Sequence, residues 1–251
     1  MHFERQKGII KVKVTLINHT QDAAELLLFT KSTRLNLSPA LMDEIRGWPP
    51  ERKAAELAYM ANTIPSSWEF ISYTFLVEGV SRAYTHQQVR TRAASYAQQT
   101  LRVLDVSAGY DYVYTERNLA SPDAMSVLGA VNRVMKDAYA QLIKMGQPPE
   151  DARGILPTNI ATSIVCGFNL RTMAELARSR TGGRTQGEYQ QVVNAMCDAV
   201  LAVHPWAEPF LFPRQRDYFA EVEAFAEREY GGDLLKKGEL LKIIDHMRKE
   251  K

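Results

Sequence analysis

Hydrophobic and polar residues follow two different periodicities along the chain. Alternation at residues 11–18 predicts a strand, and dense branched and aromatic residues predict buried strands at 68–78 and 158–169. Gly79 ends the second strand, and a stretch containing Tyr and Gly at 107–122 is expected to be loop or strand. Apolar residues at helical spacing predict helices at 21–31, 39–46, 51–62, 80–90, 124–145, 150–153, 170–180, 186–203, 219–229 and 233–251.

Composition is that of an ordinary soluble globular protein. The 251 residues suit a single domain, with a helical tail at about 213–251, and no internal repeat or linker interrupts them. A net charge of +2 gives no reason to expect a nucleic-acid polymer or an anionic membrane as partner. Residues 1–13 do not resemble a secretory signal, and no apolar run reaches the length of a membrane span, so we expect a cytoplasmic protein.

Cysteine chemistry and metal binding are not expected. Cys166 and Cys197 both lie in apolar contexts, which favours reduced core residues over a disulfide or a nucleophile. His86 and His204 are interpreted as structural residues. The sequence has no metal-ligand spacing, no phosphate-cradling glycine loop and no nucleophile elbow.

The most informative segment lies at residues 86–102. It contains Arg90, Arg92 and Arg102 together with four glutamines, and no acidic residue occurs between Glu78 and Asp105. Arginine presents planar, permanently charged donor pairs that suit phosphate oxygens, and a glutamine amide can bind the polar edge of a base. These arginines could instead be solvated surface charges, but their clustering away from acids favours a site for a nucleotide or a phosphate-bearing cofactor.

This segment resembles the signature of the flavin-dependent thymidylate synthases (the ThyX class), which runs roughly His-Gln-x-x-Arg-His-Arg-x-x-Ser-x-Asn-x-x-Ser-x-Arg. The chain keeps its residues in register at His86, Gln87, Arg90, Arg92, Ser95 and Arg102. Further similar elements follow in the family's order at 152–157 (ARGILP), 169–171 (NLR) and 180–188 (Arg180, then RTQGE). The resemblance covers about residues 12–212.

The resemblance implies a fold, a reaction and an assembly. The fold is α/β, with a central, mostly antiparallel sheet flanked by long helices. The reaction is C5 methylation of dUMP to dTMP, with 5,10-methylenetetrahydrofolate as carbon donor and FAD, reduced by NADPH, as hydride source. Family members assemble as homotetramers with FAD and dUMP at subunit interfaces. No enzyme cysteine is needed, which agrees with the buried contexts of both cysteines.

The resemblance also assigns roles to individual residues. Arg180 corresponds to the arginine facing the uracil edge, where a fixed cation stabilises the negative charge that develops as C5 becomes nucleophilic. The predicted cofactor-binding residues are Ser66, Glu69, Arg90, Thr91, Arg92, Asn169 and Arg171. The predicted substrate-binding residues are Gln87, Gln99, Thr100, Arg102, Arg153 and Arg180.

Simpler roles remain open for two of these positions, and one nearby arginine is not assigned to a ligand. Arg171 has the i,i+4 spacing for an ion pair with Glu175, which does not exclude cofactor contact. Glu69 could simply end a buried patch after Trp68. Arg178 is interpreted as a helix-surface charge and not as a ligand.

The chain departs from the family pattern at several positions. Thr91 and Ile64 stand where histidines are usual near the flavin, which removes two groups that can donate or relay protons. Ala97 replaces Asn and Thr100 replaces Ser in what we expect to be a loop facing the nucleotide, and Val103 replaces a usual Tyr. Because a smaller Ala97 leaves room for a hydroxyl, we hypothesise that UMP is accepted as well as dUMP.

These departures keep two alternatives to dUMP methylation open. The first is a UMP/dUMP methylase, or a hydroxymethylase in which water traps the one-carbon intermediate. The second is an inactive relative that binds nucleotide or flavin. Retention of Arg90, Arg102, Arg153 and Arg180 argues against the inactive alternative.

Overall fold

A computed structural model describes residues 5–6, 9–33, 35, 37–181, 187–213 and 218–249. The chain divides into two compact units, Met1–Pro213 and Arg214–Lys251. In the second unit, helices α11 (Tyr218–Tyr230) and α12 (Leu234–Lys249) pack against each other. The single domain with a helical tail from about residue 213 stays a prediction. Gln186, at the start of one predicted helix, and residues 250–251 of the last helix lie outside the described residues.

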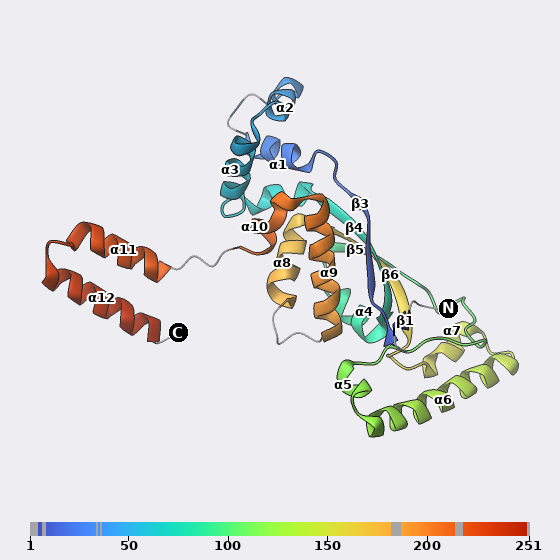
Figure 1. Ribbon diagram of the computed structural model, residues 1–251. Coiled ribbons are helices and arrows are strands. Elements are labelled where there is room, and N and C mark those ends of the chain that lie inside the picture. The colour runs from blue at the N-terminus through green and yellow to red at the C-terminus, as the bar shows by residue number, and fades with distance from the viewer. Residues whose placement is uncertain are drawn as a thin grey trace. The chain divides into compact units, whose positions relative to one another are not determined.

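The first unit is organised around a four-stranded antiparallel sheet. Its order is β3 (Lys13–His19), β4 (Ser72–Ser81), β6 (Ala161–Asn169) and β5 (Ala94–Gln98). Alternate residues of the two central strands are buried, because successive side chains of a strand point to opposite faces. Helices α8 (Leu170–Arg180) and α9 (Gly187–Val203) lie along one side of the sheet in Figure 1. The predicted α/β fold with a mostly antiparallel sheet is therefore confirmed.

Further helices and a second, smaller sheet complete the first unit (Figure 1). The small sheet pairs β1 (Arg5–Gln6) with β2 (Ile9–Ile10). The other elements are α1 (Ala23–Lys31), α2 (Pro39–Arg46), α3 (Pro50–Met60), η1 (Pro65–Phe70), α4 (Arg82–Gln88), α5 (Glu116–Leu119), α6 (Pro122–Lys144), α7 (Pro149–Ala152), η2 (Arg153–Ile155), η3 (Pro205–Ala207) and α10 (Glu208–Leu211). Among the described residues, every helix is too short or too polar to cross a lipid bilayer.

Two hydrophobic cores hold these elements in place. The larger lies between the sheet and α8 and α9, and includes Tyr73, Phe75 and Met196, all fully buried. A smaller core packs Tyr139 of α6 against Ile160, just before β6. The long helix α6 is therefore attached to the sheet through its own apolar cluster.

Two predicted boundaries around β4 were wrong. Residues 68–70 were expected to begin the strand, but they belong to the 3₁₀ helix η1, which starts at Pro65, a residue whose fixed φ suits a helical first turn. Val80 and Ser81 were expected to be helical, but β4 continues through them. Gly79 lies inside the strand with φ +70°, at an irregularity in the pairing with β6 between Val77 and Val80.

Gly79 cannot be replaced by a larger residue without strain. An added Cβ would lie 2.7 Å from the Lys11 carbonyl oxygen and 2.9 Å from Ile10 Cγ2. The left-handed backbone and this close approach both require glycine. The bulge also switches the buried face: Phe75 and Val77 are buried before it, and Val80 is buried after it.

Strand β5 was not predicted. Residues 94–98 pair with β6 along their whole length, so Ala97 lies in an edge strand and not in a loop as expected. The sequence ASYAQ has few branched or large apolar residues, and pairing with β6 determines its conformation. Within the 107–122 stretch, Tyr112 bridges to Ile160 and α5 forms a single helical turn.

Candidate functional site

The arginine segment follows directly from α4. The Ser81 hydroxyl caps this helix by accepting from the Tyr84 N–H at 3.0 Å, and the helix ends at Gln88. The turn after it is fixed by the Tyr96 hydroxyl, which lies 2.8 Å from the carbonyl oxygens of both Gln88 and Thr91. A short edge strand and a capped helix therefore hold the turn that carries Arg90 and Arg92.

The two arginines of this turn pair with none of the described residues. Arg90 and Arg92 are exposed, and neither side chain forms a hydrogen bond or ion pair with any described residue. A pair of unneutralised guanidinium groups on a rigid turn is suited to bind an anion.

The N-terminus of α8 lies beside the same turn. Asn169 Oδ1 caps the helix by accepting from the Thr172 N–H at 2.8 Å, and Thr172 Oγ1 donates to the Ala93 carbonyl at 3.0 Å. This helix end adds the positive pole of its dipole to the charge of the arginines. The surroundings therefore fit a phosphate or diphosphate group.

Arg171, in the first turn of α8, forms ion pairs with two acids. Its Nη1 lies 2.6 Å from Glu69 Oε1, and its Nε lies 3.6 Å from Glu175 Oε1. Glu69 is exposed on η1 directly after the buried Ser67 and Trp68, so it does end a buried patch as well as contacting Arg171. The predicted pairing with Glu175 exists, together with a closer contact to Glu69.

The predicted cofactor-binding residues thus lie on three adjoining segments: η1, the turn after α4 and the start of α8. We call them the turn group, which consists of Ser66, Glu69, Arg90, Thr91, Arg92, Asn169 and Arg171. Ser66 is exposed and joins the group only through its place on η1.

A second group forms at the other end of β5. Arg82 Nη2 donates to the Gln99 carbonyl at 2.7 Å, and the charge of Arg153 lies close enough to lower the Arg82 pKa, beyond the larger lowering that burial causes. Arg102 Nε lies 2.8 Å from Glu150 Oε2, and Arg153 Nε donates to the Glu150 carbonyl at 3.2 Å. Two arginines that repel one another would both be stabilised by an anion between them.

Polar atoms in this second group are buried without partners. Among the described residues, nothing bonds to Arg82 Nε or to Gln99 Oε1. Unsatisfied buried polar atoms are rare, and they are expected where a ligand supplies the missing bonds. We call this set the arginine group: Arg82, Gln99, Thr100, Arg102 and Arg153. Thr100 contributes by accepting from the Arg102 N–H at 3.0 Å.

Arg82 was not singled out from the sequence. It lies within the acid-free stretch between Glu78 and Asp105, but it is separated along the sequence from the three arginines already noted and was therefore not grouped with them. The antiparallel arrangement of α4 and β5 brings it to Gln99, 17 residues further along the chain. The acid-free stretch was therefore a signal that could have included it.

Arg180 occupies the last turn of α8, facing α9. Its guanidinium lies 5.0 Å from the Tyr189 ring, and its Nε is buried with no partner among the described residues. Tyr189 packs edge-on against Tyr84 of α4, with ring centroids 5.3 Å apart. Gln87, on the last turn of α4, is partly buried. Arg180 is therefore a cation that pairs with no acid in the described part of the chain, and it packs on an aromatic ring next to α4.

Glu188 ties α9 to the start of α4. Its two carboxylate oxygens accept from the Ser81 N–H and the Ser81 hydroxyl, each at 2.6 Å. Burial raises the pKa of Glu188, and the two hydrogen bonds from Ser81 partly offset this. The neighbouring Arg184, Thr185 and Gln186 of the same sequence element lie outside the described residues.

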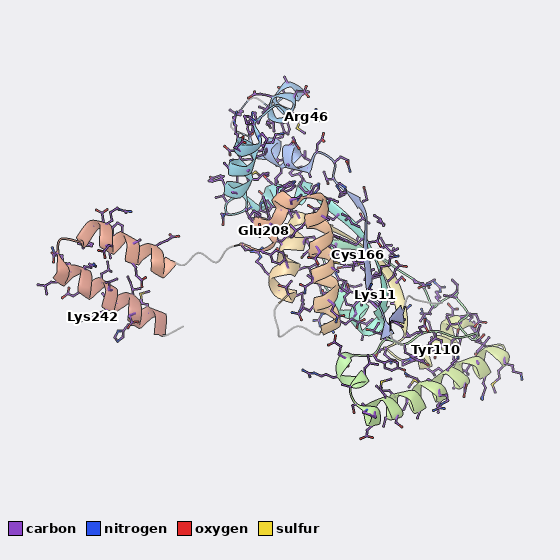
Figure 2. All side chains as sticks on the ribbon, in the orientation of Figure 1. Lys11, Arg46, Tyr110, Cys166, Glu208 and Lys242 are labelled. Carbon is purple, nitrogen blue, oxygen red and sulfur yellow. The ribbon has the colours of Figure 1, made fainter. Side chains whose placement is uncertain are left out.

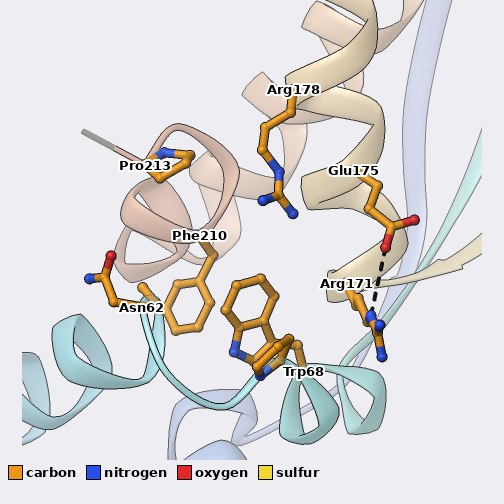
Figure 3. A pocket seen from close by; sticks show the side chains of 9 residues that line it. Asn62, Trp68, Arg171, Glu175, Arg178, Phe210 and Pro213 are labelled. Atoms are coloured by element: carbon orange, nitrogen blue, oxygen red, sulfur yellow. Dashed lines mark ion pairs between the residues drawn. The ribbon is translucent and has the colours of Figure 1, made fainter. Parts of the chain in front are cut away.

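A pocket of about 380 Å³ adjoins the turn group (Figure 3). Its lining comes from the end of α3, from η1, from α8 and from α10: Ala61, Asn62, Pro65, Trp68, Arg171, Glu175, Arg178, Phe210 and Pro213. Arg178 was interpreted as a helix-surface charge. It is exposed, but Figure 3 shows its guanidinium directed into the pocket.

Neither cysteine is available as a nucleophile. Both thiols are free and buried, and burial raises the pKa of Cys166 and of Cys197 to about 12. Figure 2 shows Cys166 within the first unit, where it lies on β6. In the part of the chain that the structure describes, no cluster of His, Cys, Asp and Glu could hold a metal ion.

Comparisons with known proteins give one consistent family. The family model described as "Thymidylate synthase complementing protein" matches residues 15–206. A "Flavin-dependent thymidylate synthase" from Geobacter sulfurreducens is 30% identical over 200 residues, which cover 77% of this chain and 84% of that protein. One from Nitratidesulfovibrio vulgaris is 32% identical over 207 residues, with the same coverages of 77% and 84%.

A solved structure has the same fold. The crystal structure of PolB, a UMP/dUMP methylase from Streptomyces cacaoi bound with 5-Br dUMP, matches with a TM-score of 0.68 and 16% identity, over 80% of this chain and 94% of that one. At this identity the likeness concerns the fold alone. The matched family model and the named relatives confirm the family predicted from the arginine motif, and the chain belongs to the thymidylate synthase complementing protein family, which includes flavin-dependent thymidylate synthases.

Proposed function

We propose that this protein catalyses the flavin-dependent C5 methylation of dUMP to dTMP. The carbon donor is 5,10-methylenetetrahydrofolate, and NADPH reduces the bound FAD, which supplies the hydride that completes the methyl group. The observation that carries the proposal is that Arg90, Arg92 and Arg153 form no ion pair with any described acid. They stand at motif positions that the family uses for flavin and nucleotide, and the charge of Arg153 lies near Arg82. Family membership and this charge arrangement support the same reaction.

The turn group is suited to hold the flavin cofactor. Arg90 and Arg92 pair with no described acid, and the capped N-terminus of α8 lies next to them, so a diphosphate gains both charge and N–H donors there. The exposed Glu69–Arg171 pair offers a carboxylate and a guanidinium that can each bind a sugar hydroxyl or a ring heteroatom.

The arginine group is suited to hold the nucleotide phosphate. Arg82 and Arg153 repel one another, and Arg82 Nε lacks a partner among the described residues, so a phosphate dianion would satisfy both. Gln99 Oε1, also unpartnered there, can accept from a hydroxyl of the ligand. Glu150, which pairs with Arg102, would have to share that guanidinium with the phosphate.

Arg180 is the residue we assign to charge stabilisation at the uracil ring. Its positive charge is not neutralised by any described acid, and Tyr189 holds the guanidinium in one place. A preorganised cation stabilises developing negative charge without the cost of reorienting solvent. Both thiols have pKa values far above neutrality, so neither cysteine is available as a nucleophile, which agrees with this assignment.

We further infer a homotetramer with active sites at subunit interfaces. Within one chain, the turn group and the arginine group lie at opposite ends of β5, which at five residues is roughly 17 Å long. A second copy can bring the two groups into one site. Helix α6 also has an apolar stripe at i, i+4 and i+7, formed by Val127, Val131 and Val134, which are 65%, 44% and 69% exposed.

UMP is the second candidate substrate. Ala97 lies in β5, two residues before Gln99, and its small exposed side chain leaves space beside the arginine group. A pocket that is merely roomy rejects an added hydroxyl weakly. Competition between dUMP and UMP would measure this preference, and undetectable UMP turnover would exclude UMP.

The first test of the proposal is an absorption spectrum of the purified protein after incubation with FAD. We expect a flavin spectrum that bleaches when NADPH is added without oxygen, at a rate that dUMP or UMP changes. Product analysis with 5,10-methylenetetrahydrofolate then separates methylation from hydroxymethylation. A protein that takes up no FAD, or whose flavin NADPH cannot reduce, would instead identify an inactive relative.

The matched variants are Arg180→Ala and Arg133→Ala. Arg133 is an exposed arginine on α6, outside both groups. We expect Arg180→Ala to lose turnover by roughly 100-fold or more while retaining flavin, as for loss of a preorganised charge. Arg133→Ala should behave as the unmodified protein.

A further inference from the structure

The pocket beside the turn group combines three kinds of chemistry. Trp68 and Phe210 form an apolar wall, packed edge to face with ring centroids 5.1 Å apart. Trp68 is fixed because its Nε1 donates to the Met60 carbonyl at 3.2 Å. The amide of Asn62 uses its Nδ2 to donate to the Ala58 carbonyl at 3.0 Å, which leaves Oδ1 as a free acceptor among the described residues.

The charges that line the pocket do not cancel. Arg171 is neutralised by Glu69 and Glu175, which lie at 2.6 and 3.6 Å. Arg178 donates its Nε to the Ala174 carbonyl at 3.2 Å and forms no ion pair with any described residue. Its terminal nitrogens point toward Trp68 and Phe210 in Figure 3, so one uncompensated guanidinium faces the cavity. A ligand with a single dianionic group would pair with this guanidinium.

We propose that this pocket binds the adenosine 2′-phosphate end of NADPH. The proposal rests on the proposed function, because it gives the reductant a binding place next to the residues assigned to the flavin. A flat adenine suits the apolar wall, its exocyclic amino group suits the Asn62 acceptor, and the 2′-phosphate pairs with Arg178. A single arginine near the ribose is the usual means by which proteins accommodate the phosphate that distinguishes NADP from NAD.

The size of the pocket agrees with part of a dinucleotide. A volume of about 380 Å³ is near the lower end for small-molecule sites, enough for a nucleoside phosphate but not for a whole dinucleotide. The nicotinamide half would then extend out past Arg171 and Glu69 toward the turn group. The pocket therefore confers preference for NADPH over NADH and leaves the hydride-transfer chemistry to the neighbouring site.

The direct test is calorimetric titration of the purified full-length protein with 2′,5′-ADP and with 5′-AMP, which lacks the 2′-phosphate. We expect 2′,5′-ADP to bind more tightly. Arg178→Ala should weaken 2′,5′-ADP about tenfold, the scale of one charge-assisted contact, and leave 5′-AMP unchanged. Alanine favours helix, so the variant should fold, and Arg133→Ala serves as the matched arginine control.

The second readout is the rate of flavin reduction by NADPH and by NADH. Arg178→Ala should lower the NADPH-to-NADH rate ratio about tenfold through the NADPH rate alone. An unchanged ratio in a variant whose flavin is still reduced would overturn the pocket assignment and leave the proposed function standing. Flavin that neither dinucleotide reduces would overturn both. Equal affinity of the unmodified protein for 2′,5′-ADP and 5′-AMP would also overturn the assignment.

Discussion

Replacing Glu188 by alanine tests whether α9 holds the start of α4. In the folded protein both oxygens of Glu188 accept hydrogen bonds from Ser81, which is 4% exposed. The substitution leaves the Ser81 N–H and hydroxyl without their acceptor in a place that little water reaches. The same hydroxyl caps α4, the helix that leads into Arg90 and Arg92.

The expected destabilisation follows from the two lost hydrogen bonds. A buried donor left unsatisfied costs about 1–3 kcal/mol, and the hydroxyl can rotate to recover part of its share, so we expect a total of about 3 kcal/mol. For a unit of this size, that lowers Tm by roughly 6–12 °C. Glu188→Gln keeps one acceptor oxygen and should lose about half as much.

The assay is thermal and urea unfolding of Glu188→Ala, Ser81→Ala and the double variant. If Glu188 and Ser81 interact as described, the losses of unfolding free energy in the two single variants should not sum to the loss in the double variant. The difference, which is the coupling energy, should be about 1–2 kcal/mol. Additive effects, or a Glu188→Ala variant as stable as the unmodified protein, would show that water replaces the contact and that α4 is positioned in another way.

Other substitutions separate the proposed roles. Arg82→Ala should raise the KM for dUMP about tenfold and weaken its salt dependence, because one phosphate contact is lost, and steady-state kinetics at two ionic strengths would check this. Cys166→Ala and Cys197→Ala should keep their turnover because both thiols are buried and protonated, and loss of turnover without loss of folded protein would contradict that. The pKa of His204 is lowered to about 4, chiefly by burial and also by the charge of His19. The neutral form of His204 is therefore favoured in the folded protein, and its contribution to the free energy of unfolding should be complete above pH 6.5 and decline as the pH falls from 6.5 to 4. His204→Gln should remove this part of the decline in a pH series of unfolding measurements.

Local signals were sufficient to place several elements from the sequence. Helix α2 begins and ends where predicted, since Ser38 caps it by accepting from the Leu41 N–H and Pro39 occupies its first turn. Helix α8 also matches its predicted bounds, with Asn169 as its cap. In both helices the residue that precedes the apolar pattern is itself the hydrogen-bonding cap.

The features that could not be predicted from the sequence depend on contacts between distant segments. Strand β5 exists because β6 pairs with it, and the composition of its residues contains little sign of that. Arg82 meets Gln99 only through the antiparallel arrangement of α4 and β5. Arg178 was interpreted as a surface charge because its spacing cannot show that Trp68 and Phe210 lie opposite it.

The bulge at Gly79 also constrains how the family can diverge. Because it switches which face of β4 is buried just before α4 begins, deleting or inserting one residue there would turn Ser81 to the opposite face of the sheet. The contact of Ser81 with Glu188 would be lost, and Arg82 would be carried away from Gln99. Insertions between Leu101 and α5 would move neither residue. We therefore expect related sequences to keep a fixed spacing from Gly79 to Arg92 and to vary in length after Arg102.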